Sequence, residues 1–244
     1  TSCRSMKIVA LLLISCCLVA CASAPPLSEG KPMPDRTETS ALSQFVKGDF
    51  DRMADVEFAE STLGFKTLML KLYRRNPKEL AKSTTDTPEK MADWVFNGDD
   101  QHHWQFKELD NKQGTEAIFL AFNNDYQGDR VLAYIVGLQT MMLKAHGGKK
   151  EFYLTDSIHP QSLYNAARNV EIAAWKISTS RNQKGELFLL TNEINSQERN
   201  LSFEREFGKI IGRADLFAFM LAEKSQRLIS RISQSLATAV FLPF

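Results

Sequence analysis

The feature that most constrains the fold of this chain is an apolar pattern with helical spacing late in the sequence. Small or apolar side chains recur there every three or four positions: Phe207, Ile211, Ala214, Ala218, Leu221, Ser225, Leu228 and Ile232. This spacing is typical of one face of an amphipathic helix. Ser202 precedes the pattern as a candidate N-cap, and Glu204 in the first turn is favoured by the helix dipole. The sequence therefore predicts a long C-terminal helix.

Similar patterns predict helices earlier in the chain. The first runs from Phe50 to Arg75. We expect its core side to consist of Met53, Val56, Ala59, Leu63, Leu70 and Tyr73. It stops at Asn76-Pro77, where Asn can cap the next helix and Pro fits its first turn. Thr87-Pro88 repeats this start signal for a further helix.

Three more helices follow from the same start and stop signals. They cover residues 115–122 and 129–145, and run from Pro160 to about Ile177. A short β-hairpin near 178–192 is the most β-structure we expect, because Asn-Gln-Lys-Gly there is a turn signal. The predicted fold class is therefore all-α, a helical bundle.

The start of the chain predicts where the protein is located in the cell. Met6 is the expected initiator, with residues 1–5 as upstream sequence, and Lys7 supplies a basic charge. The apolar run 8–20 is shorter than the roughly 20 residues that span a bilayer, but it is typical of a secretory signal peptide. It ends in Leu18-Val19-Ala20-Cys21, which resembles the lipobox of bacterial lipoproteins.

The lipobox resemblance implies that residues 1–20 are removed and that Cys21 carries acyl chains, of the palmitate type, on its thiol and its new amino group. Two or three such chains anchor a protein stably to a membrane, whereas one holds only marginally. Ala22, where Asp would favour inner-membrane retention, implies the outer membrane of a Gram-negative host, facing the periplasm. The Pro- and Ser-rich residues 21–42 are predicted to be a disordered tether for a helical domain over 43–244.

Cysteine and charge content narrow the chemistry of that domain. All four cysteines lie at or before Cys21, so the mature domain has no disulfide and no thiolate, and its core alone must hold it together. Loss of Arg4 and Lys7 lowers the 30 basic residues to 28, against 29 acidic residues, a net charge near −1. This balance excludes nucleic acid as an expected partner.

Histidine spacing gives no metal motif. None of the four histidines belongs to a His-x-x-x-His or His-Glu-x-x-His pattern. His102-His103 lies beside Asp99-Asp100, a combination that could bind a metal but is more typical of a solvated loop. We therefore predict no metal site and no cofactor.

The predicted helix from Pro160 offers a candidate binding site. Its expected core side consists of Leu163, Ala166, Ala167, Val170, Ala174 and Ile177. Tyr164, Arg168 and Trp175 lie towards the opposite side. Glu171 is within reach of Arg168, three residues away. Either this face binds an anion or glycan, or Arg168 forms a structural ion pair with Glu171 over an aromatic ring, which is the commoner arrangement.

Glu60-Ser61 is a candidate catalytic pair. Its context, Ala-Glu-Ser-Thr-Leu-Gly-Phe, faintly resembles lytic transglycosylases, in which a lone Glu acts as acid and base. The Gly-Leu-Met-Gln element expected downstream in that family is missing. Glu60, and Glu171 beside Arg168, are therefore weak candidate acids.

Two further features concern packing. Gly208 and Gly212, four residues apart, are expected to let another helix approach closely. The alternating apolar residues 236–244 are expected to pack onto the bundle as a single tail.

Two segments of the domain, 72–77 and 163–169, loosely resemble uncharacterised proteobacterial lipoproteins, a resemblance that implies no activity. Because no catalytic set is complete, we expect a non-catalytic envelope lipoprotein that binds another envelope component, with an envelope protein as partner, in assembly, transport or maintenance. The alternatives are an enzyme that acts on peptidoglycan or another glycan, and a binder of small ligands.

Overall fold

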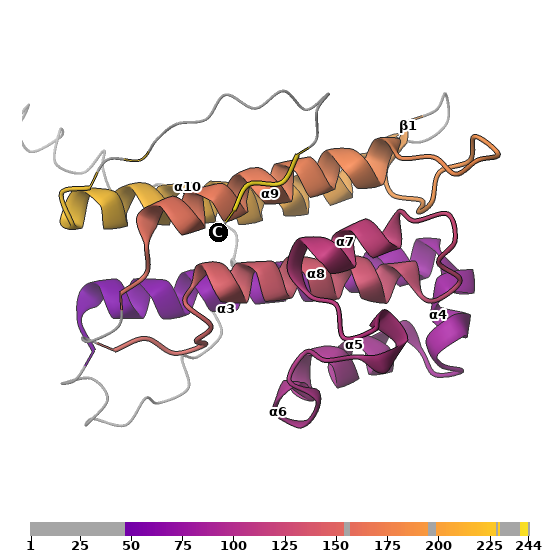
Figure 1. The fold of residues 1–244 in the computed structure, drawn as a ribbon, viewed down its shortest axis with the longest axis horizontal. Helices are drawn as coiled ribbons and strands as arrows, with labels where there is room; N and C mark the ends of the chain where they lie inside the picture. Colours follow the sequence, from indigo (N-terminus) through magenta and orange to yellow (C-terminus); the bar gives the residue numbers. More distant parts are fainter. Residues whose placement is uncertain (1–46, 154–156, 195–198, 228, 230–239, 244) are drawn as a thin grey trace, which may run out of the picture. The chain divides into compact units, whose positions relative to one another are not determined.

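Eight α-helices and a 3₁₀ turn make up most of the chain that the computed structural model describes, residues 47–153, 157–194, 199–227, 229 and 240–243 (Figure 1). They are α3 (Asp49–Arg75), α4 (Pro77–Ser83), α5 (Pro88–Asn97), α6 (Asp99–His102), η1 (Lys107–Leu109), α7 (Gly114–Ala121), α8 (Arg130–Ala145), α9 (Pro160–Thr179) and α10 (Ser202–Lys224). The predicted all-α class and the long C-terminal helix are confirmed. The predicted signal peptide, Cys21 and the tether lie outside the described residues.

β-Structure is limited, within these described ranges, to two short features. Strands β1 (Glu193–Ile194) and β2 (Arg199–Asn200) pair antiparallel. A single bridge joins Arg181 to Leu187, inside the region 178–192 where at most a hairpin is predicted. The two-stranded ladder lies just beyond that region.

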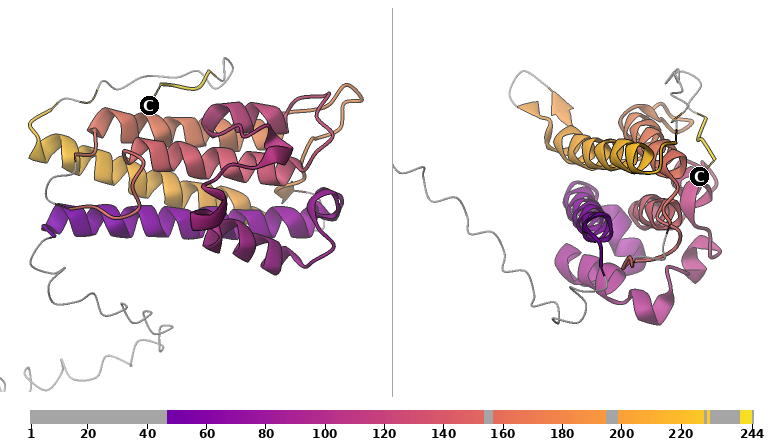
Figure 2. Two further views of the ribbon diagram at one scale, coloured as in Figure 1. Left: turned by 60° about the horizontal axis from the view of Figure 1, so that its bottom comes forward. Right: turned by 90° about the vertical axis from the view of Figure 1, so that its left-hand side faces the viewer.

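The four longest helices form an antiparallel bundle (Figures 1 and 2). Both α8 and α10 pack against α3 and against α9, so each long helix has two long neighbours. Contacts between α3 and α10 step in opposite directions along the two helices, from Lys71 with Ser202 to Gly64 with Ile210. The shorter α7 packs along α8, and α4 and α5 pack against α3.

Three polar contacts fix the register between α3 and α8. At one end, the Tyr73 hydroxyl donates to Asp129 Oδ2 at 2.7 Å. In the middle, Gln139 Nε2 donates to Thr62 Oγ1 at 3.0 Å. At the other end, Glu57 Oε2 lies 2.6 Å from His146 Nε2. Because buried polar groups must be paired, a slip of one turn would leave several of them unsatisfied.

A glycine allows α7 to lie close to α8. A Cβ built on Gly137 would lie 2.6 Å from Ile118 Cγ1 and 2.7 Å from the Gly114 carbonyl oxygen. Real side chains do not approach so closely, so this position of α8 requires glycine. By contrast, nothing lies within 4 Å of a Cβ built on Gly208 or Gly212 of α10. The expected close approach of another helix at these two glycines is therefore wrong for the described part of the chain.

The core side of α3 differs from the prediction. Tyr73 is buried as expected, but Val56, Ala59 and Leu63 are exposed. The buried side consists of Ala54, Phe58, Phe65, Leu68, Met69 and Leu72. Because α3 is apolar on two sides, periodicity alone did not indicate which side faces the core. For α9, the predicted core side is buried throughout and thus confirmed.

Of two predicted helix caps, Ser202 is wrong, whereas Asn76 occupies the predicted N-cap position of α4 without a capping side-chain hydrogen bond. Ser202 is the first residue of α10 rather than its cap, and Leu201 occupies the capping position. The Asn76 side chain does not cap α4. Instead, its amide accepts from the Leu190 backbone N–H at 2.8 Å and donates to the Leu190 and Leu72 carbonyls. The contact of Asn76 with Leu190 replaces the local capping hydrogen bond of α4.

We predict opposite effects for two glycine-to-alanine substitutions. Gly137→Ala should lower the free energy of unfolding by about 2 kcal/mol, because α7 must move away from α8. Gly212→Ala should raise it by roughly 0.5–1 kcal/mol, because alanine has the higher helix propensity and its Cβ meets open space. Urea unfolding followed by circular dichroism measures both. A loss of stability in Gly212→Ala would contradict the open surface.

Asp129 provides a second prediction. Its Oδ1 accepts from the Val131 and Leu132 N–H groups and its Oδ2 from the Tyr73 and Ser83 hydroxyls. Asp129→Ala should therefore cost about 2 kcal/mol in urea unfolding at pH 7. Asp129→Asn, the matched control, keeps an oxygen cap and should cost less.

The loss in the free energy of unfolding caused by Asp129→Asn should depend on pH. Burial raises the pKa of Asp129, although its hydrogen bonds with Leu132, Tyr73 and Ser83 oppose this. The folded chain therefore holds this proton more tightly than the unfolded chain, and the resulting stabilisation is lost as pH rises through the raised pKa. Asp129→Asn should thus cost less at pH 7 than at pH 4. A cost that grows between pH 4 and pH 7 would contradict this assignment.

Candidate functional site

Arg168 lies between α9 and α10, where it contacts two carboxylates. Its side chain is 17% exposed, and one nitrogen lies 2.5 Å from Asp215 Oδ2 and 3.0 Å from Glu171 Oε1. The guanidinium stacks over the Tyr164 ring, 5.0 Å from its centroid. The expected pairing with Glu171 and stacking on an aromatic ring are confirmed. Asp215, on α10, was not foreseen because it is 47 residues away in the sequence.

The charge balance of this cluster does not favour an anion. One guanidinium faces two carboxylates, so the cluster has no spare positive charge. Burial raises the pKa of Glu171 and of Asp215, and Arg168 opposes the rise in both. Trp175, the third predicted binding residue, is half-buried and lies seven residues further along α9, about 10 Å from Arg168 by helical rise. The anion or glycan subsite stays a prediction.

Glu60 and Ser61, the candidate catalytic pair, point to different sides of α3. Glu60 is exposed, and its backbone carbonyl and carboxylate face Arg213, with the carboxylate 3.9 Å away. Ser61 is fully buried and donates to Glu57 Oε1 at 2.9 Å. A joint action of the two side chains at one reacting atom would therefore require α3 to change its packing.

The buried Ser61 belongs to a network with Glu57 and His146. Nδ1 of His146 faces the Met142 carbonyl oxygen at 2.9 Å and must carry a hydrogen, because that oxygen can only accept. Nε2 lies 2.6 Å from Glu57 Oε2. The carboxylate lies between the hydroxyl and the imidazole, whereas a nucleophilic triad needs the imidazole next to the hydroxyl. This order fits a structural network rather than a nucleophile.

His102, which was considered as a metal ligand, already has contacts at both ring nitrogens. His102 Nε2 lies 3.1 Å from the Val95 carbonyl oxygen, and its Nδ1 accepts from the Trp104 backbone N–H. Within the described residues, no group of three His, Cys, Asp or Glu side chains is placed to hold a metal ion.

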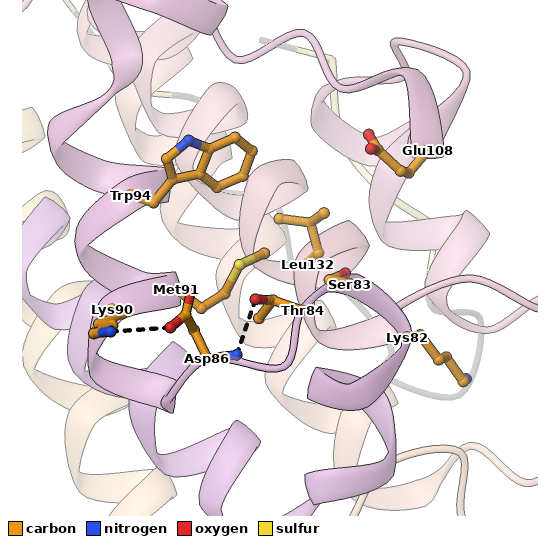
Figure 3. Close-up of a pocket in the computed structure, with 9 residues that line it drawn as sticks. All are labelled: Lys82, Ser83, Thr84, Asp86, Lys90, Met91, Trp94, Glu108 and Leu132. Atoms are coloured by element: carbon orange, nitrogen blue, oxygen red, sulfur yellow. Dashed lines mark hydrogen bonds and ion pairs between the residues drawn. The ribbon is translucent and has the colours of Figure 1, made fainter.

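A depression of about 350 Å³ lies beside α4 and α5, and none of its lining residues was a predicted site residue (Figure 3). Met91, Trp94 and Leu132 give it an apolar lining, and Trp94 is half exposed. Its polar lining includes Lys90, paired with Asp86 at 3.0 Å. This lining could take a small amphipathic molecule. Periodicity does not indicate this depression, because Trp94 has the spacing of an ordinary apolar residue in the helix that follows Thr87-Pro88.

The exposed apolar side chains of α3 and α10 form a second surface that the sequence did not predict. Val56 and Leu63 are 46% and 56% exposed, and Leu216 of α10 is 62% exposed. Contacts between the antiparallel helices pair Glu60 with Arg213 and Gly64 with Ile210, so Leu216 lies level with Val56. We call Val56, Leu63 and Leu216 the α3–α10 face. Exposed apolar side chains mark a protein-binding surface where they form a continuous patch.

Comparisons with known proteins leave the chain unassigned. No protein-family model matches it, and searches of curated proteins and of solved structures find no significant match. Among the helices of the described ranges, none combines the length and apolar character needed to cross a bilayer.

The Arg168 cluster gives a testable prediction. Arg168→Met should lower the free energy of unfolding by about 2 kcal/mol at pH 7, because Asp215 and Glu171 would lose their cation. The loss should be smaller at pH 4, since carboxylates with a raised pKa take up protons more readily. Urea unfolding at both pH values measures this.

The matched control is Arg213→Met, whose pair with Glu60 is more exposed and should contribute less than about 1 kcal/mol. Arg168→Met/Asp215→Leu should recover part of the lost stability. If Arg168→Met is as stable as the parent, Arg168 is not a structural ion pair, and the binding interpretation gains support.

Proposed function

We propose that this protein is a non-catalytic envelope lipoprotein, anchored to a membrane through Cys21, that binds another envelope protein. The observation that carries the proposal is the α3–α10 face, three large apolar side chains that the described part of the chain leaves exposed. Such an adaptor acts in assembly, transport or maintenance of the envelope. Its proposed location is the outer membrane, facing the periplasm.

The chemistry of the α3–α10 face favours a protein partner with an apolar helix or strand. Full burial of an exposed leucine or valine contributes about 1.5–3 kcal/mol, so three side chains supply several kcal/mol on association. The Glu60–Arg213 pair lies on the same two helices, and its negative and positive charges can orient a partner protein. Lipid anchoring adds to this by holding the face near membrane partners.

The arrangement of the candidate catalytic residues supports a non-catalytic role. Glu60 faces Arg213 at the surface, whereas Ser61 is buried against Glu57. Glu171 is held by Arg168. Among the described residues, these candidate acids and the hydroxyl do not converge on one point.

Photo-crosslinking in intact cells tests the proposal. A benzophenone amino acid placed at Leu63 or Leu216 should capture a specific envelope protein, and the same group at Lys184, in an exposed turn, should not. Capture should fall at least about tenfold in Cys21→Ala if the anchor brings the partners together by raising their local concentration. Mass spectrometry identifies the captured protein.

Substitution of the face provides the control. Leu63→Lys and Leu216→Lys should abolish capture from the other position while changing the free energy of unfolding by less than about 0.5 kcal/mol, because both side chains are exposed. Leu190→Lys, 49% exposed in a loop, should leave capture unchanged. Equal capture at all three crosslinker positions would sink the proposal.

The alternative is an enzyme acting on peptidoglycan or another glycan. The raised pKa of Glu171 is the observation in its favour, because burial favours the protonated carboxyl, the form that acts as a general acid. Digestion of muropeptides that Glu171→Gln or Glu60→Gln abolishes would establish it. The third possibility, a small-ligand binder, would use the depression beside Trp94.

A further inference from the structure

The depression beside α4 and α5 has an aromatic side that neighbouring rings hold in place. The Trp94 ring lines the depression and is 50% exposed (Figure 3). It contacts the rings of His102 and Phe106, with centroids 5.6 Å and 5.7 Å away. His102 is itself held, because its Nε2 lies 3.1 Å from the Val95 carbonyl oxygen. A ligand can therefore reach the exposed part of the indole ring without a rearrangement of the chain.

A carboxylate lies on the other side of the depression. Figure 3 shows Trp94 and Glu108 on either side of an apolar floor. Met91 and Leu132 form this floor and are 6% and 2% exposed. The backbone of Glu108 is held by the Tyr126 hydroxyl, which donates to its carbonyl oxygen at 3.3 Å. Among the residues that the structure describes, none forms a hydrogen bond or an ion pair with the Glu108 carboxylate.

The other charged groups around the depression are already paired. Lys82 Nζ lies 2.7 Å from Glu79 Oε1, and the Lys82 side chain points away from the other residues labelled in Figure 3. Lys90 Nζ lies 3.0 Å from Asp86 Oδ1. Two lysines thus accompany three carboxylates, those of Glu79, Asp86 and Glu108, which leaves a net charge of −1. Since the other two carboxylates are paired, this charge is located on Glu108.

The hydroxyl groups of the lining also have partners. Ser83 donates to Asp129 Oδ2 at 2.8 Å, and Thr84 Oγ1 accepts from the Asp86 backbone N–H at 3.0 Å. A ligand rich in hydroxyl groups, such as a sugar, would find few free hydrogen-bonding groups here. The groups that remain for a ligand are the apolar floor, the indole ring and one carboxylate.

We propose that this depression is a binding site for an organic cation, a small molecule that carries an ammonium group on an apolar body. The indole ring of Trp94 and the carboxylate of Glu108 both attract the ammonium group. The apolar body packs against Met91 and Leu132. The volume of about 350 Å³ lies within the range of small-molecule sites. The site shares no residue with the α3–α10 face and does not depend on the adaptor proposal.

Three soluble molecules of similar size test the charge preference of the site. At pH 7 phenethylamine carries an ammonium group, 2-phenylethanol is neutral and 3-phenylpropanoate is an anion. Each is titrated into the full chain in a non-ionic detergent, and NMR follows the indole N–H signal of Trp94, identified by its loss in Trp94→Leu. Phenethylamine should shift this signal saturably and bind at least about fivefold more tightly than 2-phenylethanol, and 3-phenylpropanoate should bind most weakly.

Glu108→Gln separates the charge of the site from its shape. It should weaken phenethylamine binding at least about threefold and leave 2-phenylethanol binding unchanged, because the two side chains have nearly the same size. The matched control is Glu116→Gln, which removes an exposed carboxylate in the first turn of α7, outside the lining. It lowers the negative charge of the chain equally and should leave both affinities unchanged. Glu108 is exposed, so its substitution should preserve the circular dichroism spectrum.

A third variant should bind phenethylamine more tightly, a change that misfolding does not produce. Lys90→Met removes the cation paired with Asp86 and thereby leaves a second unpaired carboxylate beside the site. The affinity for phenethylamine should therefore rise at least about twofold, and an unchanged or lower affinity would count against the proposal.

Four other results would overturn the proposal. They are equal affinities for all three molecules, tighter binding of 3-phenylpropanoate than of phenethylamine, a parent chain in which none of the three shifts the Trp94 signal, and a Glu108→Gln variant that loses both ligands to the same extent.

Discussion

The register between α3 and α8 is the constraint on which the rest of the structure depends. Tyr73 with Asp129, Thr62 with Gln139, and Glu57 with His146 tie the two helices at both ends and in the middle. Between these contacts α8 is buried almost throughout, and α3, α4, α7 and α9 all pack against it. Asp129 also brings Ser83 of α4 to this junction. Since none of these groups can be left unpaired at low cost, one alignment is strongly preferred.

Fixing α8 in this way decides where the neighbouring helices can lie. Gly137 lets α7 pack closely against one side of α8, and α9 packs against another side of α8. Residues 240–243 contact both α9, through Asn169, and α7, through Phe119. On α3, the sides used by α8 and α10 leave Val56 and Leu63 outside. The exposed α3–α10 face is thus a consequence of the same packing.

The candidate residues illustrate how packing assigns roles to similar side chains. Glu57 and Glu60 are one turn apart on α3, yet Glu57 is buried with His146 and Glu60 is exposed beside Arg213. Arg168 looked like a binding residue because its helix is apolar on two sides. Asp215, from a helix far away in the sequence, contacts it and makes the pair part of the α9–α10 junction. Asn165 and Asn169 of α9 belong to no recognisable motif, yet their side chains bind the main chain of Leu242 and Pro243.

The sequence by itself determined the helical class and the helix boundaries at prolines and glycines, because these depend on local hydrogen bonding and side-chain periodicity. It also identified the core side of α9 and the packing of residues 240–243 onto the bundle. The tertiary structure alone decided which apolar side of α3 faces inward, and that the glycines of α10 stay open. It also decided that the Asn76 side chain binds the backbone of Leu190 instead of capping α4. The physical reason is that a helix with two apolar sides, or a polar side chain with several possible partners, has no local preference between them. Only the neighbouring helices and loops that packing brings into contact select one side or one partner.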